Sequence, residues 1–187
     1  MPLPLAAVGA FAYLQSQSAL REAGQGEVEL ATQLAARTLT NWVAERLDDV
    51  RDLAGTARVR SMDAAQLSEA VSQYHQRWGT DLYELVFVAG LDGKTVYMTA
   101  GSQVDVSDRA YFQKARGGEA VISDVLISRQ SGNPVFVVAV PIEREGDVVG
   151  VLGATLNTRV LVEELAAAQM GQTGEAYLVN RDGYMMT

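Results

Sequence analysis

Arg109 is the side chain with the clearest capacity for chemistry, and the sequence places it at the start of a short helix. Ser107 can cap a helix that runs to Arg116, so Arg109 falls in its first turn. A helix N-terminus favours anions, because its N–H groups are unpaired and carry partial positive charge. A guanidinium opposes the helix dipole there, so a carboxylate held by two parallel hydrogen bonds explains it best. The alternative is an ion pair with Asp105 or Asp108.

Enzyme chemistry finds little support in the sequence. His75 is the single histidine, and the chain has no cysteine, which excludes disulfides, thiolate catalysis and Cys-ligated zinc. No His/Asp/Glu cluster has metal-ligand spacing, and no nucleophile-elbow, Walker or dinucleotide motif occurs. We therefore predict a protein that is not an enzyme and that needs no metal or cofactor.

The charge balance argues against nucleic acid as a partner. The chain has 15 Lys and Arg against 23 Asp and Glu, a formal net charge of −8. Phosphate binding needs clusters of Lys and Arg, and no basic run is longer than two residues. Because 48% of the residues are hydrophobic, the chain can build a core of its own. Its length fits about one domain with helical extensions.

The N-terminal part reads as two helical segments. Residues 2–14 carry no charge and are too short for a full span, so we interpret them as the end of a transmembrane helix. A buried terminal helix is the alternative. From about residue 16 to 57 a long helix follows, which either packs along a sheet or pairs with its copy in a dimer. Its apolar stripe consists of Leu39, Trp42, Val43, Leu47, Val50, Leu53 and Ala54.

The remaining pattern predicts an α+β domain. Asp63 caps a second helix that ends at Trp78, before Gly79. Strands follow at 85–89, 95–99, 121–129, 134–142 and 148–157, and then a helix at 159–170. We expect a PAS-like antiparallel sheet of about five strands, flanked by helices on one side.

A hairpin occurs twice along the chain. Residues 87–99 place an Asp-Gly turn between two apolar strands, and residues 177–187 repeat that order up to the last residue. The repeat predicts the truncated start of a second, similar module. The alternative is that the last hairpin completes the sheet of the first module.

Seven segments in order resemble the double Cache sensor family. They are Asp92-Gly93 and residues 106–112, 121–124, 128–135, 139–142, 150–153 and 171–179. The resemblance implies the end of a transmembrane helix at 1–15 and a stalk helix at 16–60. It further implies a membrane-distal module at 61–158, and a connecting helix with the start of a proximal module at 159–187.

The same resemblance implies a function. Such a region is the extracytoplasmic, periplasmic sensor of a bacterial membrane receptor, whose output is a histidine kinase, a chemotaxis signalling domain or a cyclic-di-nucleotide enzyme. In the family the residue matching Arg109 holds ligand anions, and the one matching Tyr111 lines the pocket. Phe112 is expected in the core. The candidate ligand-binding residues are Arg109, Tyr111, Ser128, Tyr97, Thr155 and Asp124.

Two departures from the family's sequence pattern narrow the class of possible ligands. Where its amino-acid-binding branch has a Tyr and an Asp that hold the ligand's ammonium, this chain has Leu126 and Thr155. An ammonium buried there would lack a charge partner. We therefore expect a C2–C4 organic acid without an amine.

Two other interpretations stay open at this point. One is a dimerisation or partner-protein module without a small ligand. The other is a cytoplasmic PAS-like sensor with a bound chromophore, against which the apolar segment and the long leading helix count.

Overall fold

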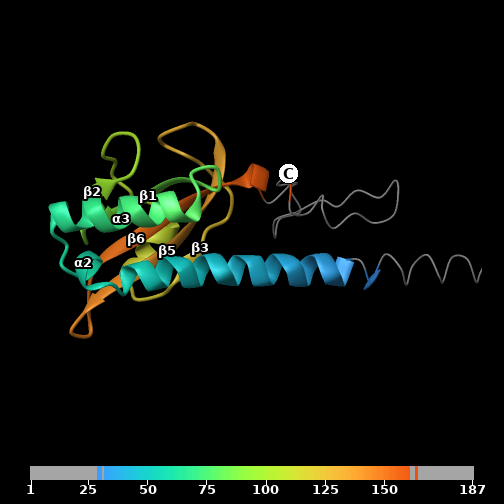
Figure 1. The fold of residues 1–187 in the computed structure, drawn as a ribbon, viewed down its shortest axis with the longest axis horizontal. Coiled ribbons are helices and arrows are strands. Elements are labelled where there is room, and N and C mark those ends of the chain that lie inside the picture. Colours follow the sequence, from blue (N-terminus) through green and yellow to red (C-terminus); the bar gives the residue numbers. More distant parts are fainter. Residues whose placement is uncertain (1–28, 31, 161–162, 164–187) are drawn as a thin grey trace, which may run out of the picture.

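A six-stranded antiparallel sheet forms the centre of the domain in the computed structural model, which describes residues 29–30, 32–160 and 163 (Figure 1). The strand order is β2-β1-β6-β5-β3, and β4 also pairs with β5. The predicted α+β class is therefore confirmed. The strands are β1 (Tyr83–Ala89), β2 (Thr95–Met98), β3 (Val121–Ile122), β4 (Leu126–Ile127), β5 (Pro134–Arg144) and β6 (Asp147–Asn157).

The sixth strand arises because the expected strand at 121–129 is two short strands. Ile122 pairs with Val138, and Leu126 pairs with Val135. The chain advances four residues from Ile122 to Leu126, whereas β5 advances only three from Val135 to Val138. The pairing with β5 is therefore interrupted between β3 and β4. The Ser123 hydroxyl bridges the break by accepting a hydrogen bond from the Val137 amide at 2.8 Å.

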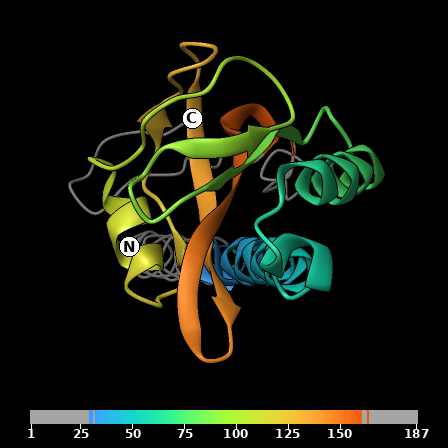
Figure 2. The same cartoon turned by 90° about the vertical axis from the view of Figure 1, so that its left-hand side faces the viewer.

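Helices cover both faces of the sheet, whereas the sequence indicated one face (Figure 2). The N-terminal helix, described over 32–54, and α3 (Ala64–Trp78) lie on one face, with the short α2 (Ala57–Arg60) between them. The predicted limits of α3 are confirmed, since Asp63 accepts a hydrogen bond from the Gln66 amide at 3.0 Å and Gly79 follows with a φ of 100°. On the other face lies α4 (Ala110–Arg116).

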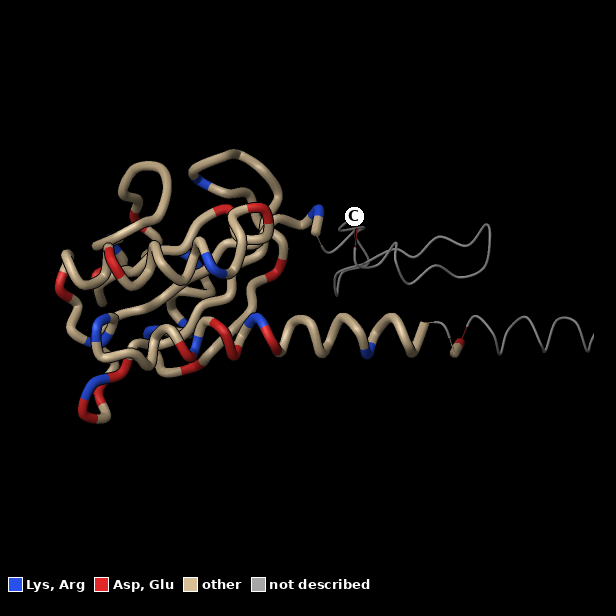
Figure 3. The backbone as a smooth tube through the Cα atoms, in the orientation of Figure 1, with Lys and Arg blue, Asp and Glu red and all other residues tan. Residues whose placement is uncertain are grey.

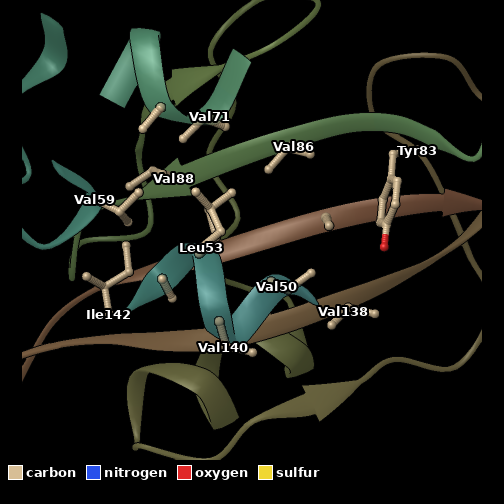
Figure 4. Close-up of a cluster of buried hydrophobic side chains, with 14 of the residues drawn as sticks. Val50, Leu53, Val59, Val71, Tyr83, Val86, Val88, Val138, Val140 and Ile142 are labelled. Carbon is tan, nitrogen blue, oxygen red and sulfur yellow. The ribbon is translucent and has the colours of Figure 1, made fainter. Parts of the chain in front are cut away.

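Alternation along the strands builds two cores. Val86 and Val88 of β1 belong to the core under the N-terminal helix and α3, which Figure 4 shows. Leu85 and Phe87 point the other way and pack with Phe112 of α4. Phe112 is fully buried, as expected. Because both faces are apolar, β1 reads as a continuous hydrophobic run and not as an alternating one.

The N-terminal helix packs along the sheet through the end of its apolar stripe. Val50 and Leu53 are 0% exposed, and Trp42 packs its ring against Phe136 of β5 with centroids 6.1 Å apart. Further along the described helix, Leu30 and Leu34 are 59% and 55% exposed. The described helices include none that is apolar enough, over a sufficient length, to cross a bilayer.

Several expectations fall outside the described residues. These are the uncharged segment at 2–14, the second hairpin at 177–187 and most of the helix at 159–170. Within the described chain, acidic and basic residues occur together on the helices and turns (Figure 3).

Leu53→Ala tests the core under the helix. We expect it to lower the free energy of unfolding by about 2–5 kcal/mol, because a buried leucine leaves a cavity. Leu91→Ala is the matched control, because Leu91 in the β1–β2 turn is 44% exposed, and its expected change is within about 0.5 kcal/mol. Urea unfolding followed by circular dichroism measures both, and equal midpoints would contradict the packing.

Candidate functional site

A small cavity lies between the sheet and α4. Its volume is about 40 Å³, enough for about three water molecules. Thr155 on the central strand β6 lines it, and its two cross-strand partners, Leu85 of β1 and Val137 of β5, line it as well. Arg109 and Tyr111 border it from the start of α4. One polar residue thus lies in the middle of an apolar floor.

Arg109 immediately precedes α4 and does not lie in its first turn. Its backbone is extended, with φ −79° and ψ 131°, and its side chain makes no capping hydrogen bond. Ser107 is not the cap that the sequence indicated, because the Asp105 carboxylate accepts a hydrogen bond from its amide at 2.8 Å and holds it in a turn. The Arg109 amide bonds to the Val106 carbonyl at 3.0 Å and completes this turn.

The Arg109 guanidinium has no carboxylate partner among the described residues. Its Nη2 donates to the Ile127 carbonyl oxygen at 3.2 Å. The two acids considered as alternatives are engaged elsewhere: Asp105 with the Ser107 amide, and Asp108 with Arg129 at 2.6 Å. The hydrogen bond from Arg129 lowers the pKa of Asp108, which keeps that acid ionised beside its own partner. Arg109 therefore presents spare N–H donors and a positive charge at the cavity.

Two hydroxyl groups at the cavity are also without partners in the described chain. Tyr111 is 6% exposed and Thr155 is 5% exposed, and neither side chain makes a hydrogen bond there. Burial raises the pKa of Tyr111 to about 12, against the opposing effect of the Arg109 charge. Its hydroxyl is therefore a proton donor at neutral pH. Together with Arg109, these groups can bind two oxygens of a small anion.

Ser128 borders the cavity in a different role from the expected one. Its hydroxyl donates to Oε1 of Glu84 at 2.6 Å and accepts from the amides of Gln130 and Ser131, each at 3.3 Å. Its one proton is thus engaged, so it does not donate to a ligand oxygen in this arrangement. Ser128 instead fixes the turn between β4 and β5.

Tyr97 and Asp124 lie away from the cavity. The Tyr97 hydroxyl lies 2.6 Å from that of Ser72 on α3, across the sheet, and its neighbour Met98 lines the cavity instead. Asp124 is exposed and lines an adjoining cleft of about 360 Å³ between α4 and residues 121–126, which shares Arg109, Tyr111 and Leu126 with the cavity. Two-residue alternation along a strand places Tyr97 and Thr99 on one face, but the sequence does not determine which face of the sheet that is.

The side chains of Gln130 and Arg129 hold the loops over the cavity. The Gln130 amide group bonds to both the N–H and the carbonyl oxygen of Ser102, which joins the β2–α4 loop to the β4–β5 turn. Arg129 makes a second link, to the Asp105 carbonyl and the Asp108 carboxylate. Gln130 in a Gly-containing turn gives no local signal of this long-range contact.

Comparison with known proteins identifies the family. The family model described as Cache domain, dCache_1, matches residues 16–187. The chain belongs to the Cache family. This match confirms the resemblance drawn from the seven sequence segments.

Relatives of this Cache chain are chemoreceptors. It is 20% identical, over 178 residues and 93% of its length, to the methyl-accepting chemotaxis protein PscA of Pseudomonas syringae pv. tomato, and it spans 28% of that relative. The ligand-binding domain of Pseudomonas fluorescens chemoreceptor CtaA, in complex with L-isoleucine, is 18% identical with a TM-score of 0.72. That match covers 91% of this chain and 71% of the other.

A second solved structure agrees in fold. The sensory domain of Campylobacter jejuni chemoreceptor Tlp3, with isoleucine bound, is 14% identical with a TM-score of 0.72 and covers 90% of this chain and 72% of that one. At these identities the solved structures establish the fold of the Cache module.

Gly101→Ala tests the link between the two loops. Gly101 has a φ of 77°, and a Cβ there would overlap the Gln130 side chain, so we expect Gln130 to leave Ser102. Hydrogen exchange at the Ser102 amide should accelerate. Gly118→Ala is the control, because its φ is 92° and its Cβ would meet nothing within 4 Å. Both variants carry a similar backbone cost of about 1–2 kcal/mol. Unchanged exchange at Ser102 in Gly101→Ala would contradict the link.

Proposed function

We propose that this Cache module is the extracytoplasmic sensor of a bacterial membrane receptor and that it binds a small carboxylate. The observation that supports it most is the Arg109 guanidinium, which faces the cavity without a carboxylate partner among the described residues. A cation left partly buried and unpaired is costly, and an anionic ligand removes that cost. The hydroxyls of Tyr111 and Thr155 supply further hydrogen bonds to the ligand oxygens.

The ligand carries no ammonium. The described residues that line the cavity include two arginines, Arg109 and Arg129, and no carboxylate. Leu126 and Thr155, which stand where amino-acid-binding relatives have ammonium partners, both line it. The Glu84 carboxylate is near the wall, but its two oxygens already accept from Ser128 and Ser131. Although the solved relatives hold amino acids, this chain lacks the charges for an ammonium.

The volume favours a small acid. The cavity of about 40 Å³, together with the cleft that adjoins it at Arg109 and Tyr111, has room for a C2–C4 acid, and the apolar floor around Thr155 suits a short hydrocarbon portion. Ligand binding would favour the closed arrangement of the two loops by as much as its affinities for the open and closed states differ. The described domain is then the membrane-distal module, and the helices at its ends carry the change toward the membrane.

Arg109→Ala tests the carboxylate site. We expect an acid among acetate, propionate, pyruvate and succinate to stabilise the wild type, by ~2.7 kcal/mol at ~100 times its dissociation constant. The variant should bind at least about tenfold more weakly, because a hydrogen bond to a charged group contributes about 1.5–3 kcal/mol. Calorimetry and thermal unfolding measure both effects.

Arg77→Ala is the matched control for that experiment. Arg77 is an exposed arginine of α3, which packs on the opposite face of the sheet, so its loss changes the net charge equally. Equal weakening in both variants would point to a general charge effect. Micromolar binding of a free amino acid to the wild type would refute the exclusion of amines.

Thr155→Asp tests the charge of the cavity. A carboxylate at this buried position should abolish acid binding through like-charge repulsion and allow binding of the corresponding amino acid. Thr155→Val keeps the shape and adds no charge, so it should weaken the acid only about two- to tenfold through one lost hydrogen bond. Calorimetry with propionate and alanine separates these results, and unaltered propionate affinity in Thr155→Asp would contradict the placement.

A homodimer through the N-terminal helix is the second function that an observation favours. Leu30 and Leu34 are one helical turn apart and more than half exposed. A second copy of the helix would bury them. We expect sedimentation velocity to show a dimer for the wild type and a monomer for Leu34→Glu, with Gln33→Glu as the control for added charge. A wild-type monomer at high micromolar concentration would contradict this pairing.

A further inference from the structure

A bulge at the start of β1 redirects the side chains that join the cavity to the N-terminal helix. The pairing of β1 with β6 shifts register between Tyr83 and Leu85. Leu85 faces the cavity and Val86 faces the helices, so uninterrupted alternation would point Tyr83 toward the cavity and Glu84 toward the helices. The bulge reverses both directions.

Glu84 consequently reaches the wall of the cavity. Its Oε1 accepts the Ser128 hydroxyl at 2.6 Å, and its Oε2 accepts the Ser131 hydroxyl at 2.8 Å. Both serines belong to the turn that Gln130 and Arg129 link to the loop over the cavity. A displacement of this turn is therefore transmitted to the backbone of β1 through two short hydrogen bonds to one carboxylate.

Tyr83 lies on the other side of the same bulge. Its side chain is 0% exposed and belongs to the core under the N-terminal helix, where Figure 4 shows it extending from β1. Its hydroxyl is buried without a hydrogen-bond partner in the described chain, whereas the buried Nε of Arg46 is in an ion pair with the Asp49 carboxylate at 3.3 Å. Arg46 and Asp49, both on the N-terminal helix, influence the Tyr83 hydroxyl electrostatically. An unsatisfied buried group marks a place where a small shift of one element against another can form a bond.

We infer, on the basis of the proposed carboxylate binding, that Glu84 is a positioning residue that couples the cavity to the N-terminal helix through the adjacent Tyr83. Closure of the β4–β5 turn over an acid draws Glu84 with it, because both serines hold its carboxylate. The bulge converts this movement into a shift of Tyr83 relative to Arg46 on the helix. Occupancy of the cavity thus changes the helix position without any contact between the ligand and the helix.

The two tryptophans of the chain report on this step. The Arg46 guanidinium carbon lies over the Trp42 ring, 5.5 Å from the centre of that ring. The ring centres of Trp78 and Tyr83 are 5.0 Å apart. Neither tryptophan lines the cavity. A change of tryptophan fluorescence, excited selectively so that Tyr111 at the cavity does not contribute, therefore comes from the helix side of the sheet and not from contact with the ligand.

The experiment titrates the full chain with whichever of acetate, propionate, pyruvate and succinate gives the largest heat in calorimetry. In the wild type, we expect a fluorescence change that saturates with the calorimetric dissociation constant. Tyr83→Phe keeps the ring and removes the hydroxyl, so the affinity should stay within about twofold while the fluorescence change per bound acid falls by at least about half. Glu84→Gln should lose the same response.

Glu119→Ala is the control for Glu84, since this exposed acid has no side-chain hydrogen bond or ion pair in the described chain. A role of Glu84 in stability alone would lower the melting temperature and leave the fluorescence change per bound acid intact. That result, or binding to the wild type with no fluorescence change, overturns the inference and leaves the carboxylate proposal standing. Absence of heat with all four acids overturns the carboxylate proposal itself.

Discussion

Two-residue alternation along β1, β5 and β6 is the constraint on which the rest of the domain depends. Each of these strands is apolar on both faces, so the sheet must be covered on both sides. The N-terminal helix and α3 cover one side, and α4 with the loops covers the other. Because α4 covers only part of its face, a small cavity stays open between its first residues and β6. The site is therefore a consequence of incomplete coverage.

In the carboxylate site that we propose, electrostatics would give the selectivity. A guanidinium and two hydroxyls face an apolar floor, and the acids nearby are already engaged with amides, hydroxyls or Arg129. An anion gains a charge partner on entry, whereas an ammonium loses its water and gains none. The absence of a carboxylate from the lining is as informative here as the presence of Arg109.

The sequence predicted the class of fold, the family and the main strands, because those depend on local patterns. Asp63 and Gly79 delimit α3 through capping and backbone conformation alone, and the apolar runs of β5 and β6 leave few other interpretations. The sequence misplaced the start of α4, because a serine at position 107 is by itself a good N-cap. In the fold the Asp105 carboxylate accepts the Ser107 amide and places Ser107 in the turn before the helix.

Long-range contacts could not be predicted from one sequence. Arg109, Tyr111 and Thr155 do meet at the cavity, but the face on which Tyr97 lies depends on strand register. Glu84 reaches Ser128 at the cavity wall only because of the bulge. Ser128 lies where the family resemblance implies. Its hydroxyl is nevertheless engaged by a residue 44 positions away, and no local pattern reveals such a partner.

The Asp-Gly turn between β1 and β2 has a second consequence. Gly93 lies against the backbone of Ser107, where an added Cβ would come within 2.5 Å of the Ser107 Cβ, and its carbonyl accepts the Val106 amide at 2.8 Å. The tip of the hairpin therefore fixes the position of residues 106–107, and Arg109 follows Ser107 by two residues. A side chain at position 93 would displace Ser107 and with it the backbone that leads to Arg109. The hairpin turn therefore constrains the position of Arg109 without lining the cavity.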